Sequence, residues 1–506
     1  MRPRMLLRGR LTIAAIVLVL SLAVHALLGG EGGEAAASPA RAHDATPLAA
    51  VGAFPKTAPS GAEPAPDAVE PVLPAPAAPP AEPPPEVAPG PAPAHVAPAR
   101  GGGVPDQILS RVPIPPPGSS RAAAPRLIAS KSSARAQLAR GERIVEFVPV
   151  EGGGQLRVEY TLDAELTDAV YDVFARGRVR LGLAVVLDPA TGEVLAYAAT
   201  DPGRLSPTET YPAASLVKVV TAAAALETVP GVANRTCHFV GSPYRLTPSR
   251  IVPPARGTEI TLERALATSN NQCFAQLAVN DLGATRLLDT FKRFGLLQSP
   301  GPGHPRGEAD PPEGDRFALG KLGCGLAGLR ITSLHAAELA ATLSTGKRVA
   351  PRWIARVTDA SGKELALPQR AGPETVLPAD TAARLRDMMT ETTLNGTARR
   401  AFRGRYGRPL LREMNVAGKT GSLSGTEPPG RYEWFIGLAP ASRPKIAIAV
   451  LVVQQKRWHT NASTVAAEVL NAIFCNGNVC NADRANQWLS AARVPSSLPP
   501  SKRAVD

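Results

Sequence analysis

Apolar residues are distributed unevenly along this chain of 506 residues, and their pattern predicts where the chain folds. Residues 11–28 are almost wholly apolar. Between residues 30 and 125 the apolar positions are mostly alanine and proline, and Phe54 is the single aromatic residue. Such a stretch cannot bury enough apolar surface to offset the entropy lost on ordering. From about residue 158 the apolar positions recur with the periods of helices and strands, so we expect a folded domain at residues 158–480.

Within this domain, the pattern predicts strands near both ends and helices between them. Residues 181–187 and 193–198 are apolar runs joined by a turn sequence, which is typical of a hairpin. Residues 434–439 and 446–453 fit paired strands. Helical spacing predicts helices at residues 164–175, 262–267, 284–294, 333–343, 379–392 and 464–474. This order indicates an α+β fold in which helices cover an antiparallel sheet.

The apolar segment at residues 11–28 follows four arginines, Arg2, Arg4, Arg8 and Arg10. This arrangement predicts an uncleaved transmembrane anchor with a cytoplasmic N-terminus. The alternative is a cleaved secretory signal, because small residues follow at Ala35-Ala36-Ala37. Either way, we expect the folded domain to be exported.

The stretch between residues 30 and 125 contains 24 of the 52 prolines. We predict an extended, disordered Pro/Ala-rich tether there, and a binding role for the stretch is the alternative. The predicted division of the chain is residues 1–10, a basic N-terminus; 11–28, the anchor; 29–125, the tether; 126–157, a short lead-in; 158–480, the folded domain; and 481–506, a C-terminal tail.

The five cysteines fit an exported domain. In an oxidising compartment Cys475 and Cys480 can close the short loop between them, and Cys237 can pair with Cys273. Cys324 would then be a free thiol. The alternative is that all five are small buried apolar residues.

A net charge of +13 and a pI near 9.8 raise the question of nucleic-acid binding. The charges are spread along the chain, only 4% of residues are aromatic, and no basic stripe with interleaved aromatic residues occurs. We therefore predict no nucleic-acid partner. The seven histidines are scattered and Cys-x-x-Cys is absent, so we predict no metal site and no cofactor. Gly418-Lys419-Thr420 mimics a phosphate-binding loop, but Glu413 stands where that loop needs a glycine.

Three short motifs with chemical content occur in order: Ser215-Leu216-Val217-Lys218, Ser269-Asn270-Asn271 and Lys419-Thr420-Gly421. A serine is a weak nucleophile at neutral pH unless a base lies beside it. Residues i and i+3 of a helix share a face, so Lys218 can reach Ser215 Oγ. The other motifs add a hydroxyl, a carboxamide and a cation. Together these groups suit acyl transfer through a serine ester.

Ser-x-x-Lys occurs three times, so the first instance has to be distinguished from the other two. Only Ser215 opens an apolar run with helical character. Ser344 precedes Gly346, a helix-end signal, and Ser442 lies two residues before Pro444. We expect turns at both of these. Ser-x-Asn and Lys-Thr-Gly each occur once, and the ordered set is far more specific than any single motif.

These motifs carry a resemblance to a known family. From about residue 158 to about residue 474 the chain resembles the transpeptidase domain of penicillin-binding proteins. Further similarity lies in residues 187–196, in Gly323-Cys324-Gly325 followed by residues 331–340, and in residues 434–440. The resemblance covers roughly three-fifths of the chain. It implies the α+β fold shared by these domains and serine β-lactamases.

The family's pattern assigns a role to the residues of the first two motifs. Ser215 would be the nucleophile, and Lys218, as a neutral amine, would take its proton. Ser269 would relay that proton toward the leaving amine. Asn271 would hold an amide of the substrate.

The third motif, by the same resemblance, binds the end of the substrate. Lys419 would bind a terminal carboxylate together with the hydroxyls of Thr420 and Ser422. Gly421 lets the strand approach the substrate closely. The backbone N–H groups of Ser215 and Ser422 would form the oxyanion hole, in which losing one donor typically costs about 3 kcal/mol in the transition state.

The resemblance implies an exported serine D,D-transpeptidase or D,D-carboxypeptidase. It would cleave D-Ala-D-Ala stem peptides of peptidoglycan through an acyl-Ser215 intermediate, with β-lactams as inhibitors. We expect a single-pass protein of the bacterial inner membrane whose catalytic domain lies outside the cytoplasm. Cell-wall synthesis proteins are expected partners.

Two other functions remain open. A serine β-lactamase of the same fold needs a carboxylate to activate water, and the sequence identifies none. Asn271 also departs from the apolar residue of the oxacillin-hydrolysing class. A non-catalytic penicillin-binding sensor or scaffold would need a signalling domain, and about ten residues precede the apolar segment.

The chain also departs from the family's pattern. We expect a monofunctional protein, because no segment before the domain is long enough for a glycosyltransferase. Only residues 126–159 are available for the folded pedestal of two-domain relatives. The Gly/Pro-rich insert at residues 299–315 is expected to be a flexible loop that affects substrate access if it lies near the cleft.

Overall fold

The computed structural model describes residues 104, 106–116, 143–150, 154–369, 371–404, 407–412, 414–455 and 460–489. The predicted anchor at residues 11–28 lies outside the described residues, as do the basic N-terminus and most of the tether. Within the described ranges, no helix combines the length and the apolar character that a membrane crossing requires.

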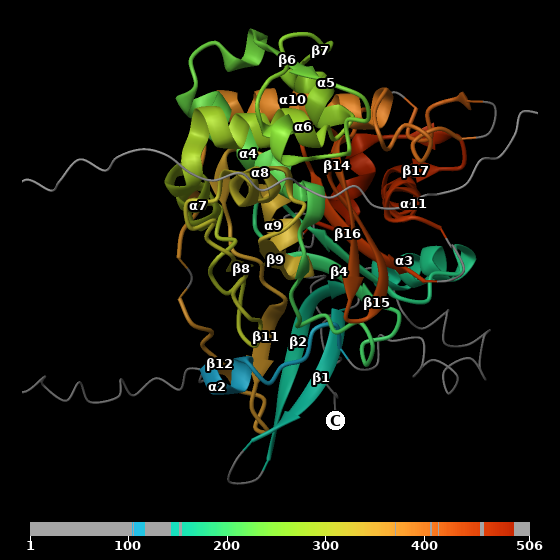
Figure 1. The fold of residues 1–506 in the computed structure, drawn as a ribbon. Coiled ribbons are helices and arrows are strands. Elements are labelled where there is room, and N and C mark those ends of the chain that lie inside the picture. Colours follow the sequence, from blue (N-terminus) through green and yellow to red (C-terminus); the bar gives the residue numbers. More distant parts are fainter. Residues whose placement is uncertain are drawn as a thin grey trace, which may run out of the picture. The chain divides into compact units, whose positions relative to one another are not determined.

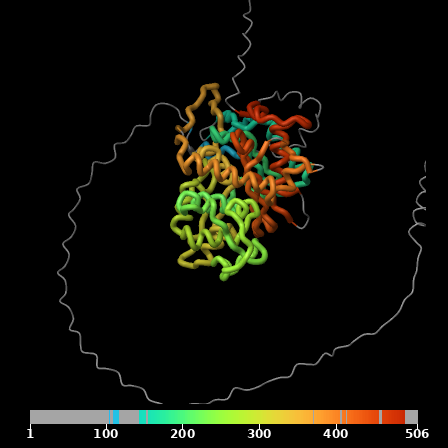
Figure 2. The backbone as a smooth tube through the Cα atoms, turned by 90° about the horizontal axis from the view of Figure 1, so that it is seen from above, coloured from blue at the N-terminus to red at the C-terminus, as the bar shows by residue number. Residues whose placement is uncertain are grey.

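A five-stranded antiparallel sheet forms the centre of the domain (Figure 1). Its strands, in the order of the sheet, are β14 (Ala417–Thr426), β15 (Pro429–Ala439), β16 (Ile446–Gln454), β3 (Gly182–Leu187) and β4 (Val194–Ala199). Both predicted strand pairs are confirmed. Because β16 pairs with β3, the first and last parts of the domain meet in one sheet, and Figure 2 shows the teal segment against the red ones.

Helices cover both faces of this sheet, as expected for the predicted α+β class. On one face lie α3 (Ala164–Arg176) and α11 (Ala462–Phe474), and on the other lies α9 (Ser333–Thr342) (Figure 1). Alternate residues of β3 therefore enter different clusters: Leu183 packs on the α9 side and Ala184 on the α3 side. A strand buried on both faces has a continuous apolar run, which is the pattern seen in the sequence.

The remaining helices form a lobe beside the sheet. They are α4 (Val217–Thr228), α5 (Leu262–Ala267), α6 (Asn271–Leu277), the π-helical segment Ala278–Leu282, α7 (Gly283–Arg293), α8 (Arg316–Cys324) and α10 (Ala379–Leu394). The six predicted helices agree with the structure to within about two residues at each end. Helices α6 and α8 were not predicted. All seven residues of α6 are buried, so it lacks the polar face that gives a helix its period.

A second, smaller sheet corrects the predicted start of the domain. It contains β1 (Arg143–Pro149), β2 (Gln155–Asp163), β11 (Ile354–Thr358) and β12 (Glu364–Leu365), in that order. The short helix α2 (Asp106–Leu109) and the residues after it are packed against the same core.

The disordered tether was predicted to extend to residue 125, and this is wrong for residues 104 and 106–116. Leu109, Val112 and Ile114 are buried, and Tyr160 Oη donates a hydrogen bond of 2.8 Å to the carbonyl oxygen of Pro113. Here leucine, isoleucine and valine replace the alanines found upstream, so enough apolar surface is available to offset ordering. Residues 481–489 of the predicted tail also pack, since Trp488 is buried.

Four pairs or groups of short strands complete the described fold. They are β5 (Tyr211–Pro212), β9 (Leu329–Ile331) and β8 (Glu308–Ala309) in one sheet; β6 (Thr236–Phe239) with β7 (Thr258–Thr261); β10 (Lys347–Arg348) with β13 (Glu374–Thr375); and β17 (Cys475–Asn476) with β18 (Val479–Cys480). The expectation of a flexible loop at residues 299–315 is therefore wrong at β8. Gly307, just before it, lies where a Cβ would overlap the carbonyl oxygen of Leu296.

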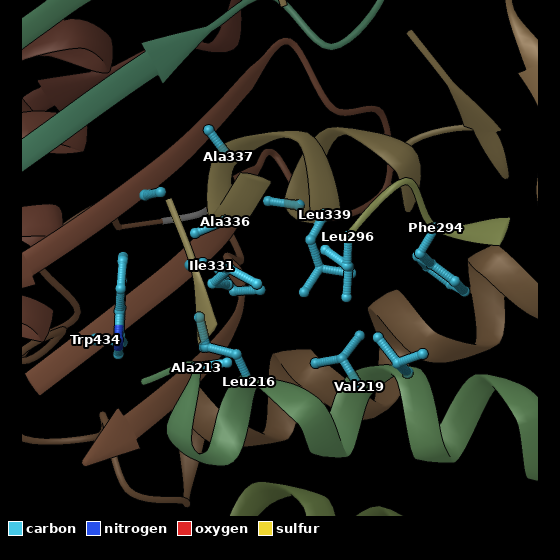
Figure 3. Packing of buried hydrophobic residues seen from close by; sticks show 14 of the residues in the cluster. Ala213, Leu216, Val219, Phe294, Leu296, Ile331, Ala336, Ala337, Leu339 and Trp434 are labelled. Carbon is cyan, nitrogen blue, oxygen red and sulfur yellow. The ribbon is translucent and has the colours of Figure 1, made fainter. Parts of the chain in front are cut away.

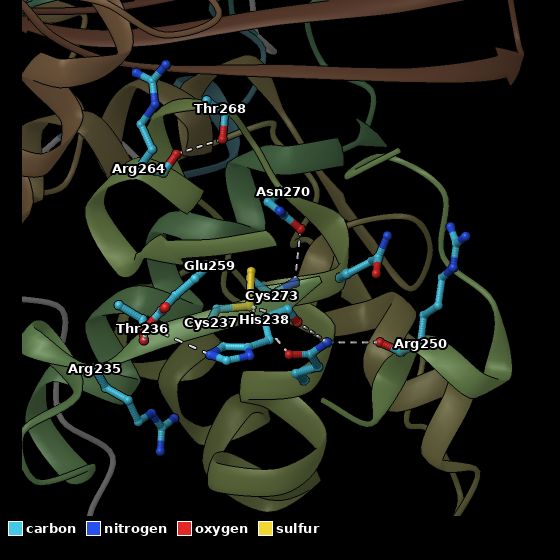
Figure 4. The surroundings of a disulfide bond; sticks show 12 residues. Arg235, Thr236, Cys237, His238, Arg250, Glu259, Arg264, Thr268, Asn270 and Cys273 are labelled. Atoms are coloured by element: carbon cyan, nitrogen blue, oxygen red, sulfur yellow. Dashed lines mark hydrogen bonds and ion pairs between the residues drawn. A yellow bond between two sulfur atoms is a disulfide. The ribbon is translucent and has the colours of Figure 1, made fainter. Parts of the chain in front are cut away.

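The cysteines pair as predicted for an oxidising compartment. Disulfides join Cys237 to Cys273 and Cys475 to Cys480, and Cys324 is a buried free thiol. The first disulfide ties β6 to α6 (Figure 4).

Glu338 of α9 gives the fold a pH-dependent stability that can be measured. Its side chain is 1% exposed, and Arg348 Nη1 lies 3.6 Å from its Oε1, too far for a hydrogen bond. Burial raises the pKa of Glu338 to about 8, although Arg348 opposes the shift. The folded protein therefore holds this proton up to about pH 8, whereas the unfolded chain loses it near pH 4.5, so stability falls as pH rises between these values.

We expect Glu338→Gln to raise the free energy of unfolding at pH 8.5 by on the order of 1 to 3 kcal/mol and to change it little at pH 5. Urea denaturation of both proteins at the two pH values measures this. Glu374→Gln is the control, because Glu374 also contacts Arg348 but is exposed. A Glu338→Gln protein whose stability difference from the parent is the same at both pH values would contradict the prediction.

Candidate active site

The turn that carries Ser215 is fixed by packing on both sides. It consists of β5, a 3₁₀ turn at Ala214–Leu216 and the start of α4. Ala214 has φ +49°, a left-handed conformation that costs a non-glycine residue about 1 kcal/mol or more. Gly325 follows α8 at φ +75°, and a Cβ there would overlap the carbonyl oxygen of Ala214.

Buried side chains anchor the same turn in the core. Figure 3 shows Ala213, Leu216 and Val219 directed toward the side chains of β9 and α9, among them Ile331. Leu216 is fully buried, so the residue next to Ser215 cannot move without disturbing the core. The helix that follows is buried nearly all round, which accounts for its continuous apolar sequence.

Lys218 is strongly perturbed by this arrangement. It is fully buried, and its Nζ donates to Ser215 Oγ at 2.7 Å, to Asn271 Oδ1 at 2.7 Å and to the carbonyl oxygen of Cys324 at 2.6 Å. Burial lowers the pKa of Lys218 to about 8, with the nearby Cys324 thiol opposing the shift. A sizeable fraction of the amine is then neutral near pH 7 to 8, and the neutral amine can accept the proton of Ser215 Oγ.

Asn271 links Lys218 to the loop between β6 and β7. Its Nδ2 donates to the carbonyl oxygen of Tyr244 at 2.7 Å, and its backbone N–H donates to that of Pro243 at 2.9 Å. The predicted role was to hold a substrate amide. In this structure Oδ1 is instead used to position Lys218, and one of the two N–H bonds of Nδ2 is used by the loop.

A ladder of amide side chains on α6 and the following π-helical segment holds that loop and the end of β6. Gln272 donates to the carbonyl oxygen of Val240 at 2.9 Å, Gln276 to that of His238 at 3.1 Å, and Asn280 to that of Ile251 at 3.0 Å. The three residues are spaced by four, so they lie on one helix face. The disulfide from Cys237 to Cys273 adds a covalent link at the same place (Figure 4).

Ser269 and Lys419 form a second hydrogen-bonded pair in the site. Lys419 is fully buried on β14, and its Nζ donates to Ser269 Oγ at 3.0 Å and to the carbonyl oxygen of Thr420 at 2.6 Å. Burial, and then the positive charge of Lys218, hold the pKa of Lys419 well below its usual value. Ser269 has φ +58°, so a second non-glycine residue of the site is in the left-handed region.

The strand β14 brings the third motif to the Ser215 turn. It is the edge strand of the central sheet, and a Cβ on Gly421 would lie 3.3 Å from the Cβ of Ala214. The hydroxyl of Thr420 hydrogen-bonds Thr397 Oγ1 at 2.6 Å, and Ser422 Oγ accepts from Arg431 Nε at 2.6 Å. The Ser422 hydroxyl, which was predicted to bind a carboxylate, is therefore held by Arg431.

The structure thus brings the predicted residues to one place. They are Ser215, Lys218, Ser269, Asn271, Lys419, Thr420, Gly421 and Ser422. The two other Ser-x-x-Lys serines, Ser344 and Ser442, lie in a turn and a bend, as predicted. Within the described part of the chain, no three His, Cys, Asp or Glu side chains are grouped so that they could hold a metal ion.

Sequence reasoning missed the backbone acceptors of the site. The carbonyl groups of Cys324 and Tyr244 have no sequence signal, because every residue has one. The glycines on either side of Cys324 are an available signal, because glycine allows close approach of the backbone. The regular spacing of Gln272, Gln276 and Asn280 is a sequence signal for the loop contacts.

This arrangement suits acyl transfer by a serine. It has a hydroxyl in contact with a buried amine of lowered pKa, a second hydroxyl in contact with a second lysine, and an edge strand along which an extended peptide can lie. Among the described residues, no aspartate or glutamate hydrogen-bonds Lys218, Lys419 or Ser269.

Comparisons with known proteins agree with this geometry. The family model of the penicillin binding protein transpeptidase domain matches residues 182–475. The peptidoglycan D,D-transpeptidase PbpA of Mycobacterium tuberculosis is 29% identical over 380 residues, which cover 66% of this chain and 75% of that protein. The peptidoglycan D,D-transpeptidase FtsI of Escherichia coli K12 is 28% identical over 346 residues, covering 63% and 54%.

One solved structure shows a similar fold. The imipenem acyl-enzyme complex of penicillin-binding protein A from M. tuberculosis matches with a TM-score of 0.52 at 24% identity. The match covers 74% of this chain and 90% of that one.

Proposed function

Because this chain belongs to the penicillin-binding protein transpeptidase family, we propose that it is a peptidoglycan D,D-transpeptidase that works through an acyl ester on Ser215. The observation that carries the proposal is Lys218. A fully buried amine lies 2.7 Å from Ser215 Oγ, and its pKa is low enough for it to act as a base.

In the first half-reaction, neutral Lys218 takes the proton from Ser215 Oγ, and the oxygen attacks the carbonyl carbon of the penultimate D-Ala. The backbone N–H groups of Ser215 and Ser422 stabilise the oxyanion. The proton passes by way of Ser269 to the leaving D-Ala nitrogen, and the peptide bond breaks. Lys419 and Thr420 hold the carboxylate of that D-Ala.

In the second half-reaction, the amine of a neighbouring stem peptide attacks the ester and Ser215 regains its proton. Water in place of the amine would give a D,D-carboxypeptidase. The names of the curated relatives favour the transpeptidase. A β-lactamase also needs fast attack by water, and the lack of a carboxylate bonded to Lys218, Lys419 or Ser269 in the described residues disfavours that alternative.

The proposal includes the location of the enzyme. Residues 11–28 anchor the chain in the bacterial inner membrane, and the tether separates the anchor from a catalytic domain outside the cytoplasm. The two disulfides support an oxidising compartment. The partners are then stem peptides, β-lactams as inhibitors, and other proteins of cell-wall synthesis.

Intact mass spectrometry after incubation with benzylpenicillin tests the proposal. We expect the parent to gain the mass of one penicillin and Ser215→Ala to gain none. Ser344→Ala is the matched control, since it removes the serine of another Ser-x-x-Lys sequence, and it should react like the parent. An unmodified parent with intact drug would indicate a non-catalytic module. An unmodified parent with hydrolysed drug would indicate a β-lactamase.

A further inference from the structure

A pocket lies beside the Ser215 turn that the proposed reaction does not use. Its volume is about 190 Å³. Its walls include Ala214 of the turn, Leu423 of β14, and three charged residues, Glu308, Asp310 and Arg330. None of the eight site residues lines it.

A three-stranded sheet fixes the position of the charged wall of the pocket, which consists of Glu308, Asp310 and Arg330, relative to Ser215. In β9, Arg330 lies directly opposite Pro212 of β5 on one side and Glu308 of β8 on the other. Residues directly opposite each other in antiparallel strands have Cβ atoms about 5 Å apart. Asp310 is held by its backbone N–H, which donates to the carbonyl oxygen of Gly328 at 2.8 Å. The wall is thus built onto the strand that ends three residues before Ser215.

The three charged side chains of this wall are exposed to solvent. Arg330 is oriented by Thr210, because its Nη2 donates to the carbonyl oxygen at 2.6 Å and its Nε to Oγ1 at 3.3 Å. Among the described residues, no ion pair involves Arg330, Glu308 or Asp310. The pocket therefore offers one cation and two anions beside an apolar floor that includes Ala214, Val217 and Leu423.

The direction of β14 tells which part of a substrate reaches this pocket. In the proposed function, the terminal carboxylate lies at Lys419 and Thr420, and the scissile carbonyl lies at the N–H of Ser422. A peptide that follows the edge of β14 then continues toward Leu423, which lines the pocket. The residue before D-Ala-D-Ala therefore comes next to it.

We propose that this pocket binds the side chain of the residue that precedes D-Ala-D-Ala, and that it selects a side chain ending in both an ammonium and a carboxylate. This inference rests on the proposed function. Arg330 pairs with the carboxylate, and Glu308 and Asp310 pair with the ammonium. A side chain that ends in an ammonium alone leaves Arg330 unpaired and close to a like charge, so it binds less well.

Three peptides of the form acyl-X-D-Ala-D-Ala test the proposal, where X is diaminopimelic acid, lysine or norleucine. The full-length protein is labelled with a fluorescent penicillin in the presence of each peptide, and the concentration that halves the labelling rate is measured. We expect the diaminopimelic acid peptide to compete at least about tenfold better than the other two. The double variant Glu308→Gln/Asp310→Asn and the variant Arg330→Gln should each lose this preference.

Penicillin labelling without peptide separates this inference from the proposed function, because the acylamino group of penicillin carries neither the ammonium nor the carboxylate that the pocket is proposed to bind. The variants should still be labelled by penicillin, and Glu313→Gln, an exposed acid of the same insert outside the pocket, should label within about twofold of the parent and keep the preference. Equal competition by the three peptides, or an unchanged preference in the variants, overturns the pocket alone. A parent that does not label with penicillin overturns the proposed function and this inference with it.

Discussion

Replacing Lys218 with glutamine is expected to lower the rate of acylation of Ser215 by benzylpenicillin by at least about a thousandfold. Glutamine keeps much of the volume and the hydrogen-bonding capacity of the side chain, but it cannot take the proton from Ser215 Oγ. Among the described residues, Lys218 is the amine that hydrogen-bonds Ser215 Oγ, whereas Lys419 Nζ bonds to Ser269 Oγ.

The pH dependence of the parent is part of the same prediction. Burial lowers the pKa of Lys218 to about 8, and only the neutral amine acts as the base. The acylation rate of the parent should therefore rise with pH up to about 8 and level off above it, whereas Lys218→Gln should lack this rise. Progress curves with a fluorescent penicillin between pH 6 and 9.5 measure both.

Lys347→Gln is the control for Lys218→Gln, because Lys347 ends another Ser-x-x-Lys sequence and is exposed on β10. It should acylate like the parent at every pH. A Lys218→Gln protein that keeps more than about a tenth of the parental rate would show that another group takes the proton.

The second large effect is expected for Gly325→Ala, a change outside the three motifs. A Cβ at this position would overlap the carbonyl oxygen of Ala214 and approach the backbone nitrogen of Ser215. The turn must then move away from α8, and Lys218 loses its alignment with Ser215 and the Cys324 carbonyl. We expect acylation to fall by at least about a hundredfold and the free energy of unfolding to fall by about 2 kcal/mol or more.

Gly231→Ala separates the steric effect from the backbone effect. Gly231 also has a positive φ, of +70°, but nothing lies within 4 Å of the position that a Cβ would take there, so only the backbone penalty of about 1 kcal/mol applies. Acylation kinetics and urea denaturation of the two variants measure the difference. Equal losses in both would contradict the assigned role of Gly325.

The sequence was sufficient for the parts of the molecule that depend on side-chain identity. Ser215, Lys218, Ser269 and Lys419 were found because hydroxyls and amines rarely occur in this order and at these spacings by chance. The apolar runs of β3 and β16 were found because a strand buried on both faces has no polar positions.

The features that the sequence does not predict depend on backbone groups or on contacts between segments far apart in the chain. The Cys324 carbonyl that binds Lys218 is invisible in sequence. Strand β8 has only two residues, and its pairing with β9 is made across about twenty residues of chain. The segment at residues 106–116 has few large aliphatic side chains and continues a long Pro/Ala-rich stretch, so its composition predicts a tether. Local composition is a poor guide where a short segment packs on a core formed elsewhere.

Because Lys218 and Lys419 are both buried in one site, their protonation can distinguish the C-terminus of a bound peptide from an internal segment. A carboxylate that enters beside Lys419 raises the pKa of that lysine and favours its protonated form. The new positive charge then disfavours protonation of Lys218. Binding of a free C-terminus at Lys419 is thereby thermodynamically linked to deprotonation of Lys218. A peptide without a terminal carboxylate can occupy the same groove, but it does not shift this equilibrium, so a larger fraction of Lys218 stays protonated beside Ser215.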